Sequence, residues 1–241
     1  MEETKQKHIY LSIVVPAYNE EKRLPESLHK LKNYADKLGK PYEILVVDDG
    51  STDNTARVAQ ELAFVHVIKQ PHNMGKGAAV KTGMLVAKGD LRLFSDADSS
   101  TPITELDKFL PHSKEYDIII GSRALKDSDI KLHQPWYREL MGKTFNKIVR
   151  IIAVGGIHDT QCGFKLFSKK AADMIFPKQT IDRWGFDVEV LYLAKKYGFQ
   201  VKEIPVVWIN DTASKVRPIV DAYKMLTEVL KVRMNAIRGK Y

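Results

Sequence analysis

Short runs of apolar, often β-branched residues recur along the first half of the chain, at residues 11–15, 44–47, 65–68, 91–94 and 118–120. Runs of this kind, bounded by polar residues, are typical of strands that are buried on both faces of a parallel sheet. Between them lie segments with helical spacing of apolar residues, at residues 24–38, 54–62 and 75–88. The alternation predicts an α/β fold with a mainly parallel central sheet and helices on both faces.

Polar clusters follow three of the predicted strands. Asn19-Glu20 comes after the first strand, Asp48-Asp49-Gly50-Ser51 after the second, and Asp96-Ala97-Asp98 after the fourth. The carboxyl ends of parallel strands share one edge of a sheet, where ligands bind in open α/β folds. We therefore expect three acidic clusters to meet in one binding site.

The pattern loosens after Gly121 into a polar loop at 126–134, a helix at about 136–154, a mixed region through Trp208 and a closing helix at about 217–238. No clean linker separates the two halves. We expect one catalytic domain over residues 1–215, with residues 1–7 disordered. A C-terminal amphipathic helix over residues 216–241 would follow it.

The composition excludes some classes of protein and leaves others open. The chain has 241 residues, of which 44% are apolar and 28% charged, which is typical of a folded globular protein. Its net charge of +8 is compatible with nucleic acid, an anionic membrane surface or phosphorylated substrates as partners. The single cysteine, Cys162, excludes an internal disulfide and suits a reducing compartment, by default the cytoplasm.

No stretch of the sequence predicts insertion into a membrane. The first residues, Met1-Glu-Glu-Thr-Lys5, do not resemble a secretory signal. No apolar run approaches the roughly 18 residues that a spanning helix needs. Any membrane association is therefore expected to be peripheral.

Asp96 and Asp98 form a D-x-D pair after an apolar run. Such close like charges repel unless a positive partner lies nearby. Carboxylate pairs bind Mg²⁺ or Mn²⁺, which often bridge them to substrate phosphates such as those of a nucleotide diphosphate. The alternative is a solvated turn, because D-x-D is frequent by chance.

Two further clusters have structural as well as functional interpretations. In the stretch Asp48 to Asp53, a turn at Gly50 and a helix cap explain the later residues. They leave Asp48 and Asp49 able to bind a nucleobase edge or ribose hydroxyls. The stretch Gly75 to Val80 lacks the third glycine of a dinucleotide fingerprint and the Ser or Thr of a P-loop. We interpret it as a helix start with small residues for close packing, where Lys76 can still face a phosphate.

Four motifs in the first half resemble those of the family 2 inverting glycosyltransferases, which have the GT-A fold: residues 14–20, 46–53, 73–77 and 95–98. Four more, at residues 121–123, 159–165, 183–189 and 214–215, look like those of the polyprenyl-phosphate sugar transferases. The stretch 183–189 is closer to the dolichyl-phosphate β-glucosyltransferases than to the mannosyl branch.

The resemblance implies a role for individual residues. It implies that the nucleotide sugar is bound by Pro16, Ala17, Tyr18, Glu20, Asp48, Asp49, Lys76, Asp96, Ala97 and Asp98. Asp96 and Asp98 would hold the metal, Mg²⁺ or Mn²⁺. Catalytic roles fall on Asp98, Arg123, Asp159 and Lys215. The acceptor side would contain Arg123, Arg138, Asp159, Gln161, Lys165, Arg183 and Trp184.

The expected reaction is metal-dependent transfer of glucose from UDP-glucose to a dolichyl-type polyprenyl phosphate, giving a β-linked product. The alternatives are mannose transfer from GDP-mannose and a soluble glycan acceptor. A phosphate monoester is largely dianionic at neutral pH, so it needs no general base. A hydroxyl acceptor does need one, for which Asp159 is the candidate; alternatively, Asp159 only bonds the neighbouring backbone.

Two predicted helices combine apolar and basic residues. In the first, the apolar stripe Met141, Phe145, Ile148 and Ile152 lies opposite Lys143, Lys147 and Arg150. In the second, Ile219, Tyr223, Leu226, Leu230 and Ile237 lie beside Lys224, Lys231, Arg233 and Arg238. Each helix suits a membrane interface, but each stripe also suits the protein core.

A lipid acceptor favours peripheral binding to an anionic membrane surface, on its cytoplasmic face. A basic nucleic-acid-binding module is the remaining alternative. We expect no nucleic-acid partner, since the acidic clusters would repel a phosphate backbone.

Overall fold

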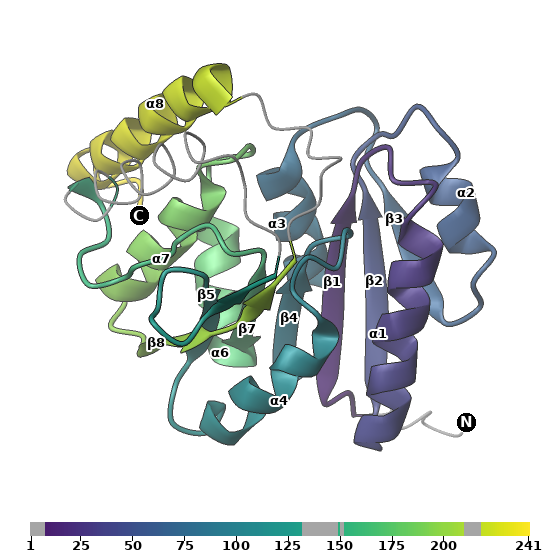
Figure 1. Ribbon diagram of the computed structural model, residues 1–241. Helices are drawn as coiled ribbons and strands as arrows, with labels where there is room; N and C mark the ends of the chain where they lie inside the picture. Colours follow the sequence, from purple (N-terminus) through teal and green to yellow (C-terminus); the bar gives the residue numbers. More distant parts are fainter. Residues whose placement is uncertain (1–7, 132–148, 150–151, 210–217) are drawn as a thin grey trace, which may run out of the picture.

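The computed structural model describes residues 8–131, 149, 152–209 and 218–241 (Figure 1). A seven-stranded sheet has the order β3-β2-β1-β4-β7-β5-β8. Its strands are β1 (Leu11–Ala17), β2 (Tyr42–Asp48), β3 (Val65–Lys69), β4 (Leu91–Ser95), β5 (Ile118–Ser122), β7 (Phe164–Ser168) and β8 (Val201–Pro205). Only β7 runs antiparallel to its neighbours, β4 and β5, so the predicted mainly parallel sheet is confirmed. A small second sheet pairs β6 (Asp129–Ile130) with β9 (Val207–Trp208).

Helices cover both faces of the sheet (Figure 1). They are α1 (Leu24–Leu38), α2 (Thr55–Gln60), α3 (Lys76–Val86), α4 (Leu106–Phe109), α6 (Lys169–Ile175), α7 (Phe186–Lys196) and α8 (Pro218–Ile237). Short 3₁₀ turns occupy η1 (Ile103–Glu105), η2 (Leu110–His112) and η3 (Phe176–Lys178). Among the described residues, no helix is long and apolar enough to cross a membrane.

Successive side chains of a strand point to opposite faces of the sheet, and this produces two separate hydrophobic cores. In β1, Val14 packs with residues of α3, α6 and α7, whereas Ile13 and Val15 pack with residues of α1 and α4 on the other face. All three are fully buried. This is the two-residue period of a strand whose faces are both covered.

The predicted strands and first three helices match the structure to within a few residues. The mixed region, which the sequence left unassigned, contains β7, α6, α7 and β8. The predicted helix at 136–154 lies largely outside the described residues, which show only its end, with Val149 buried.

The domain organisation remains a prediction. Residues 1–7 and the proposed boundary at 215 both lie outside the described residues. Helix α8 covers most of the predicted closing helix, and its Val229 and Val232 belong to the same core as α7.

Candidate active site

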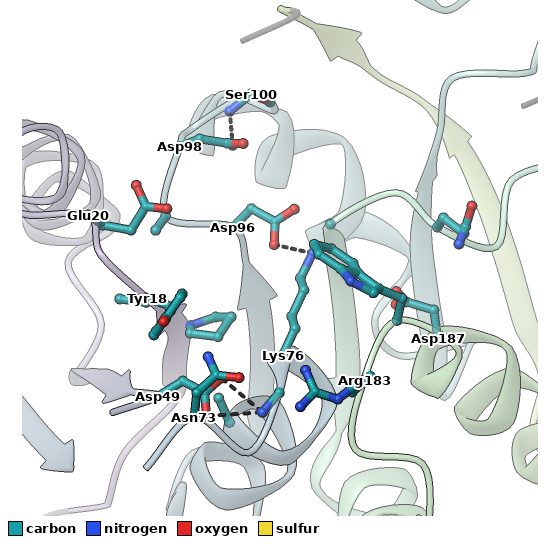
Figure 2. Close-up of a pocket in the computed structure, with 18 of the residues that line it drawn as sticks. Tyr18, Glu20, Asp49, Asn73, Lys76, Asp96, Asp98, Ser100, Arg183 and Asp187 are labelled. Atoms are coloured by element: carbon teal, nitrogen blue, oxygen red, sulfur yellow. Dashed lines mark hydrogen bonds and ion pairs between the residues drawn. The ribbon is translucent and has the colours of Figure 1, made fainter. Parts of the chain in front are cut away.

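A cavity of about 510 Å³ opens at the carboxyl ends of β1, β2 and β4 (Figure 2). Glu20, Asp49, Asp96 and Asp98 line it, so the predicted convergence of three acidic clusters is confirmed. Of the residues expected to bind the nucleotide sugar, all but Asp48 line this cavity.

Asp49 holds the loop that leads into α3. One of its oxygens accepts from the backbone N–H of Met74 at 2.8 Å, and the other accepts from Asn73 Nδ2 at 3.0 Å. The backbone N–H of Gly75 lies within hydrogen-bonding distance of both oxygens. Burial raises the pKa of Asp49, and the amide donors oppose that rise. Asp48 instead accepts from the backbone N–H of Ser51.

The glycines at the start of α3 allow close packing, as the sequence interpretation proposed. A Cβ on Gly75, whose φ is +113°, would lie 2.4 Å from the carbonyl oxygen of Asp182. A Cβ on Gly77 would lie 2.7 Å from that of Ile181. Both glycines therefore let α3 begin directly against the segment that precedes α7.

Lys76 lies between these glycines and points into the cavity (Figure 2). Its Nζ is 2.7 Å from Asp96 Oδ1, and it lies over the rings of Phe94 and Trp184 at 5.2 and 5.5 Å. Burial alone would lower the pKa of Lys76, but the charge of Asp96 raises it above its ordinary value. Lys76 is thus one positive partner that the D-x-D pair requires.

Backbone contacts fix the loop that carries Asp96 and Asp98. The N–H of Asp96 donates to the carbonyl oxygen of Gly163 at 3.0 Å, and a Cβ on Gly163 would lie 1.8 Å from Asp96 Oδ2. Asp98 Oδ1 accepts from the N–H of Ser100 at 2.9 Å. The glycine of the Asp159 to Lys165 motif therefore makes room for the Asp96 carboxylate.

The two carboxylates fit a hard divalent cation only as a partial ligand set. No group of three or more His, Cys, Asp or Glu side chains within the described ranges is placed to hold a metal. Asp96 and Asp98 both line the cavity, where a bound diphosphate and water would supply further oxygens. The donor set therefore suits Mg²⁺ or Mn²⁺ bound together with a nucleotide.

Arg123 directly follows β5, lines the cavity and is held by Asp159. Its Nε and Nη2 donate to the two Asp159 oxygens at 2.7 and 2.9 Å, and its backbone N–H also donates, at 2.9 Å. Asp159 is 1% exposed and is not among the cavity-lining residues. Burial would raise its pKa, but the charge and hydrogen bonds of Arg123 lower it to about 2.

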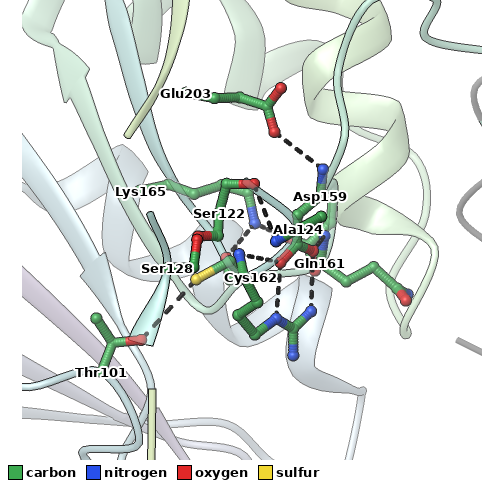
Figure 3. Close-up of polar contacts among 11 residues, drawn as sticks. Thr101, Ser122, Ala124, Ser128, Asp159, Gln161, Cys162, Lys165 and Glu203 are labelled. Carbon is green, nitrogen blue, oxygen red and sulfur yellow. Dashed lines mark hydrogen bonds and ion pairs between the residues drawn. The ribbon is translucent and has the colours of Figure 1, made fainter. Parts of the chain in front are cut away.

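The Asp159 loop is fixed in turn by β8. Glu203 accepts from the backbone N–H of His158 at 2.8 Å. It also accepts from the backbone N–H of Asp159 at 2.9 Å (Figure 3). Arg123 packs over the ring of Trp208 at 5.4 Å. The Arg123 guanidinium is therefore oriented by the Asp159 carboxylate and the Trp208 ring.

The residues expected on the acceptor side occupy different places. Gln161, Arg183 and Trp184 line the cavity, with Arg183 near Asp49 and Asn73 (Figure 2). Lys165 is 1% exposed and ion-pairs with Asp187 at 2.5 Å. Arg138 and Lys215 lie outside the described residues.

Sequence reasoning missed several residues that line the cavity: Arg23, Asn73, Asp187, Trp208 and Met225. The sequence did hold a signal for Arg23, its spacing of three residues from Glu20, with which it forms a bidentate ion pair. Met225 had none, since its place depends on how α8 packs. Arg23 adds a second cation near the D-x-D pair. Its pKa is raised mainly by Glu20, and the charges of Asp98 and Asp96 raise it further.

Comparison with known proteins places the chain among sugar transferases. The model of "Glycosyl transferase family 2" matches residues 12–176. The chain is 40% identical to "Dolichyl-phosphate beta-glucosyltransferase ALG5D" of Trichomonas vaginalis, over 93% of this chain and 73% of the relative. It is 36% identical to dolichyl-phosphate beta-glucosyltransferase of Homo sapiens, over 96% of this chain and 77% of the relative.

A solved structure shares the fold at low sequence identity. It is glucosyl-3-phosphoglycerate synthase from Mycobacterium tuberculosis in complex with Mn²⁺, UDP-glucose and phosphoglyceric acid. The TM-score is 0.69 at 18% identity, over 93% of this chain and 79% of that one.

Proposed function

The chain belongs to glycosyl transferase family 2, and on that premise we propose that it transfers glucose from UDP-glucose to dolichyl phosphate, giving a β-linked product. The family and the GT-A fold that the motifs implied are confirmed. The observation that carries the proposal is the identity of 40% and 36% to two dolichyl-phosphate beta-glucosyltransferases across more than nine-tenths of this chain.

Asp96 and Asp98 are the proposed ligands of a divalent cation, Mg²⁺ or Mn²⁺. Both lie at the end of β4 in the cavity, and the synthase of the same fold binds Mn²⁺ with UDP-glucose. When bound, such a cation stabilises the charge that develops on the leaving diphosphate. Asp49 and Asn73 would contact the nucleotide, since they line the opposite part of the same cavity.

Cations of the chain itself surround the place where phosphates would lie. Arg23, Lys76, Arg123 and Arg183 all line the cavity. Fixed positive groups stabilise a developing anion without reorganising during the reaction. Asp159 holds the Arg123 guanidinium through two hydrogen bonds, and we propose that Arg123 binds the acceptor phosphate or the leaving diphosphate. Lys215 lies outside the described residues and keeps its proposed role as a cation near the donor diphosphate or the acceptor phosphate.

We assign Asp159 a positioning role instead of a general base. It already accepts three hydrogen bonds from Arg123, and its depressed pKa makes it a weak proton acceptor. The dianionic phosphate of the acceptor attacks the anomeric carbon without losing a proton. A lipid-phosphate acceptor is therefore consistent with a site in which the buried carboxylate holds an arginine.

The proposed reaction is tested with purified protein and labelled UDP-glucose or GDP-mannose. Each donor is combined with dolichyl phosphate or with 3-phosphoglycerate, with and without Mg²⁺ or Mn²⁺. We expect metal-dependent label on the lipid from UDP-glucose, and its loss in Asp98→Asn, which keeps the shape of the side chain.

Each other outcome identifies a different enzyme. Lipid product from GDP-mannose alone indicates the mannosyl branch. Product on 3-phosphoglycerate alone indicates a soluble acceptor, as in the synthase of the same fold. Equal activity of Asp98→Asn would refute the proposed metal site.

We further propose peripheral binding to the cytoplasmic face of an anionic membrane through the outer face of α8. Tyr223, Leu230, Met234 and Ile237 expose 46–82% of their surface there. Exposed basic residues border this row: Lys224, Lys231, Arg233 and Arg238. A basic helix with an exposed apolar row suits a membrane interface, at about 1 kcal/mol for each well-placed cation.

The membrane proposal is tested by co-sedimentation with liposomes that contain phosphatidylserine. We expect binding at low salt that weakens as salt increases, and a loss of binding in Leu230→Asp combined with Met234→Asp. Binding of that double variant at the level of the unchanged protein would show that α8 does not contact the lipid.

A further inference from the structure

The inner face of α8 packs on the protein while its outer face stays exposed. Val229 and Val232 are fully buried, and Met225 is 9% exposed. On the other side, Leu230 is 48% exposed. The helix proposed to contact the membrane therefore also packs on the interior of the protein.

One polar side chain on the inner half of α8 reaches the start of α7. Glu228 Oε2 accepts the backbone N–H of Gly185 at 2.6 Å. Gly185 is the N-cap residue of α7, where a negative charge is favoured by the helix dipole. A Cβ on Gly185 would lie 2.7 Å from the Cβ of Glu228, so only glycine permits this approach.

Gly185 directly follows Arg183 and Trp184, which line the cavity described above. Trp184 lies over Lys76 Nζ at 5.5 Å, and the charge of Arg183 acts on Asp49. On the side away from α8, a Cβ on Gly75 would lie 2.9 Å from Arg183 Cγ. This segment is thus enclosed between the start of α3 and Glu228.

Two further contacts connect α8 with the same region. Asn235 Nδ2 donates to Thr180 Oγ1 at 2.9 Å, at the start of the segment that leads to Arg183. At the other end, Gln161 Nε2 lies 3.7 Å from the sulfur of Met225, and both residues line the cavity. Among the described residues, these hydrogen bonds join α8 to Gln161 of the cavity wall and to the segment from Thr180 to Gly185, and Glu228 is the one next to Arg183 and Trp184.

We propose that Glu228 is a positioning residue through which α8 holds Arg183 and Trp184 in the donor site. This inference rests on the proposed function, since it takes the cavity to bind a nucleotide sugar. The helix that meets the membrane then also completes the site for the nucleotide.

The test measures UDP binding in the presence of Mn²⁺ by isothermal titration calorimetry, without lipid. Loss of a hydrogen bond to a charged acceptor predicts that Glu228→Ala weakens UDP binding about tenfold. Glu228→Gln keeps an acceptor oxygen and should recover most of the affinity. Thr227→Ala is the matched control, because the Thr227 hydroxyl donates to the carbonyl of Lys224 on its own helix.

Equal affinity of Glu228→Ala and Thr227→Ala would overturn the proposal. If Glu228→Ala does not fold, Glu228→Asp replaces it, since the shorter carboxylate cannot keep the 2.6 Å contact. In that case, UDP binding equal to the unchanged protein would be the refuting result.

Steady-state rates separate positioning from a general loss of structure. A positioning role predicts that Glu228→Ala raises the KM for UDP-glucose about tenfold with little change in kcat or in liposome binding. A parallel fall in kcat and liposome binding would indicate structural damage and refute the proposal. Absence of lipid-linked product from the unchanged protein would refute the proposed acceptor, whereas the UDP titrations would still decide the role of Glu228.

Discussion

Replacing Asp159 with asparagine removes a buried charge and keeps the shape of the side chain. The carboxylate is 1% exposed and receives two side-chain hydrogen bonds and one backbone hydrogen bond from Arg123. An amide offers one oxygen and turns an NH₂ group toward the guanidinium donors. Removing one partner of a buried ion pair costs about 3 to 5 kcal/mol. We expect Asp159→Asn to lower the free energy of unfolding by about 3 kcal/mol.

The pH dependence gives a second measure of the same contact. The pKa of Asp159 falls from 3.8 to about 2 because the effect of Arg123 exceeds that of burial. A depressed pKa in the folded state stabilises the protein above the ordinary pKa, and this contribution is lost as pH falls toward the folded value. The shift corresponds to roughly 2 kcal/mol, so the difference between the variant and the unchanged protein should shrink between about pH 5 and pH 2.

Urea unfolding, followed by circular dichroism, measures both effects. Glu61→Gln is the control, because the Glu61 pair with Arg57 lies on the surface, where the two side chains are 58% and 65% exposed. Such pairs contribute at most about 1 kcal/mol. The reasoning fails if Asp159→Asn costs no more than Glu61→Gln. It also fails if Arg123→Met and Asp159→Asn are additive in the double variant, because partners of one pair should not add.

Three other substitutions test the site and the segment beside it. Gly163→Ala places a Cβ 1.8 Å from Asp96 Oδ2 and should weaken Mn²⁺-dependent UDP binding at least about tenfold, as measured by calorimetry. Unchanged binding would contradict a role for this close approach. Lys76→Met removes the cation 2.7 Å from Asp96 and should tighten Mn²⁺ binding without nucleotide while weakening UDP binding about tenfold; weaker Mn²⁺ binding would contradict this. Glu189→Gln disturbs a fully buried carboxylate that accepts from Thr180, Ile181 and Tyr241, and should lower the free energy of unfolding by about 2 kcal/mol; a melting temperature equal to that of the unchanged protein would contradict it.

The strands in the first half of the fold could be predicted from the local sequence, because most of them are short apolar runs that are buried on both faces of the sheet. The strand β7 was not assigned from sequence, although its burial resembles that of β4. Its segment, Phe164–Ser168, has a buried Lys165 where β4 has a buried Arg92, so the charge alone does not explain why β7 was missed. Lys165 is buried because Asp187, 22 residues later, pairs with it. A partner so distant in sequence leaves no periodic signal.

The same limit applies to the site. The sequence located Asp96 and Asp98 because both follow a recognisable strand. It did not distinguish the cavity-facing Arg123 from the Asp159 beneath it, since that difference depends on how the loop before β7 meets the end of β5. The structural reason for Gly163 also appears only when Asp96 lies against it.

Helix α8 shows how one pattern can satisfy two surroundings. Its sequence left two alternatives, a stripe in the core or a stripe at a membrane. The structure buries Val229 and Val232 but leaves Tyr223 and Leu230 exposed, so the helix has apolar residues on two sides. Contact with α7 decides which row is covered, and the exposed row is what makes the membrane proposal testable.

The charges of the cavity explain why a protein with a net charge of +8 has acidic motifs at its site. Five carboxylates and four cations of the described residues line the cavity, so its own charge is close to neutral. A divalent cation and a nucleotide diphosphate would enter with opposite charges that nearly cancel, and would preserve that balance. The surplus positive charge therefore lies elsewhere, and part of it borders the exposed apolar row of α8. Salt should accordingly weaken liposome binding much more than nucleotide binding, because the first depends on exposed charges and the second on partly buried ones.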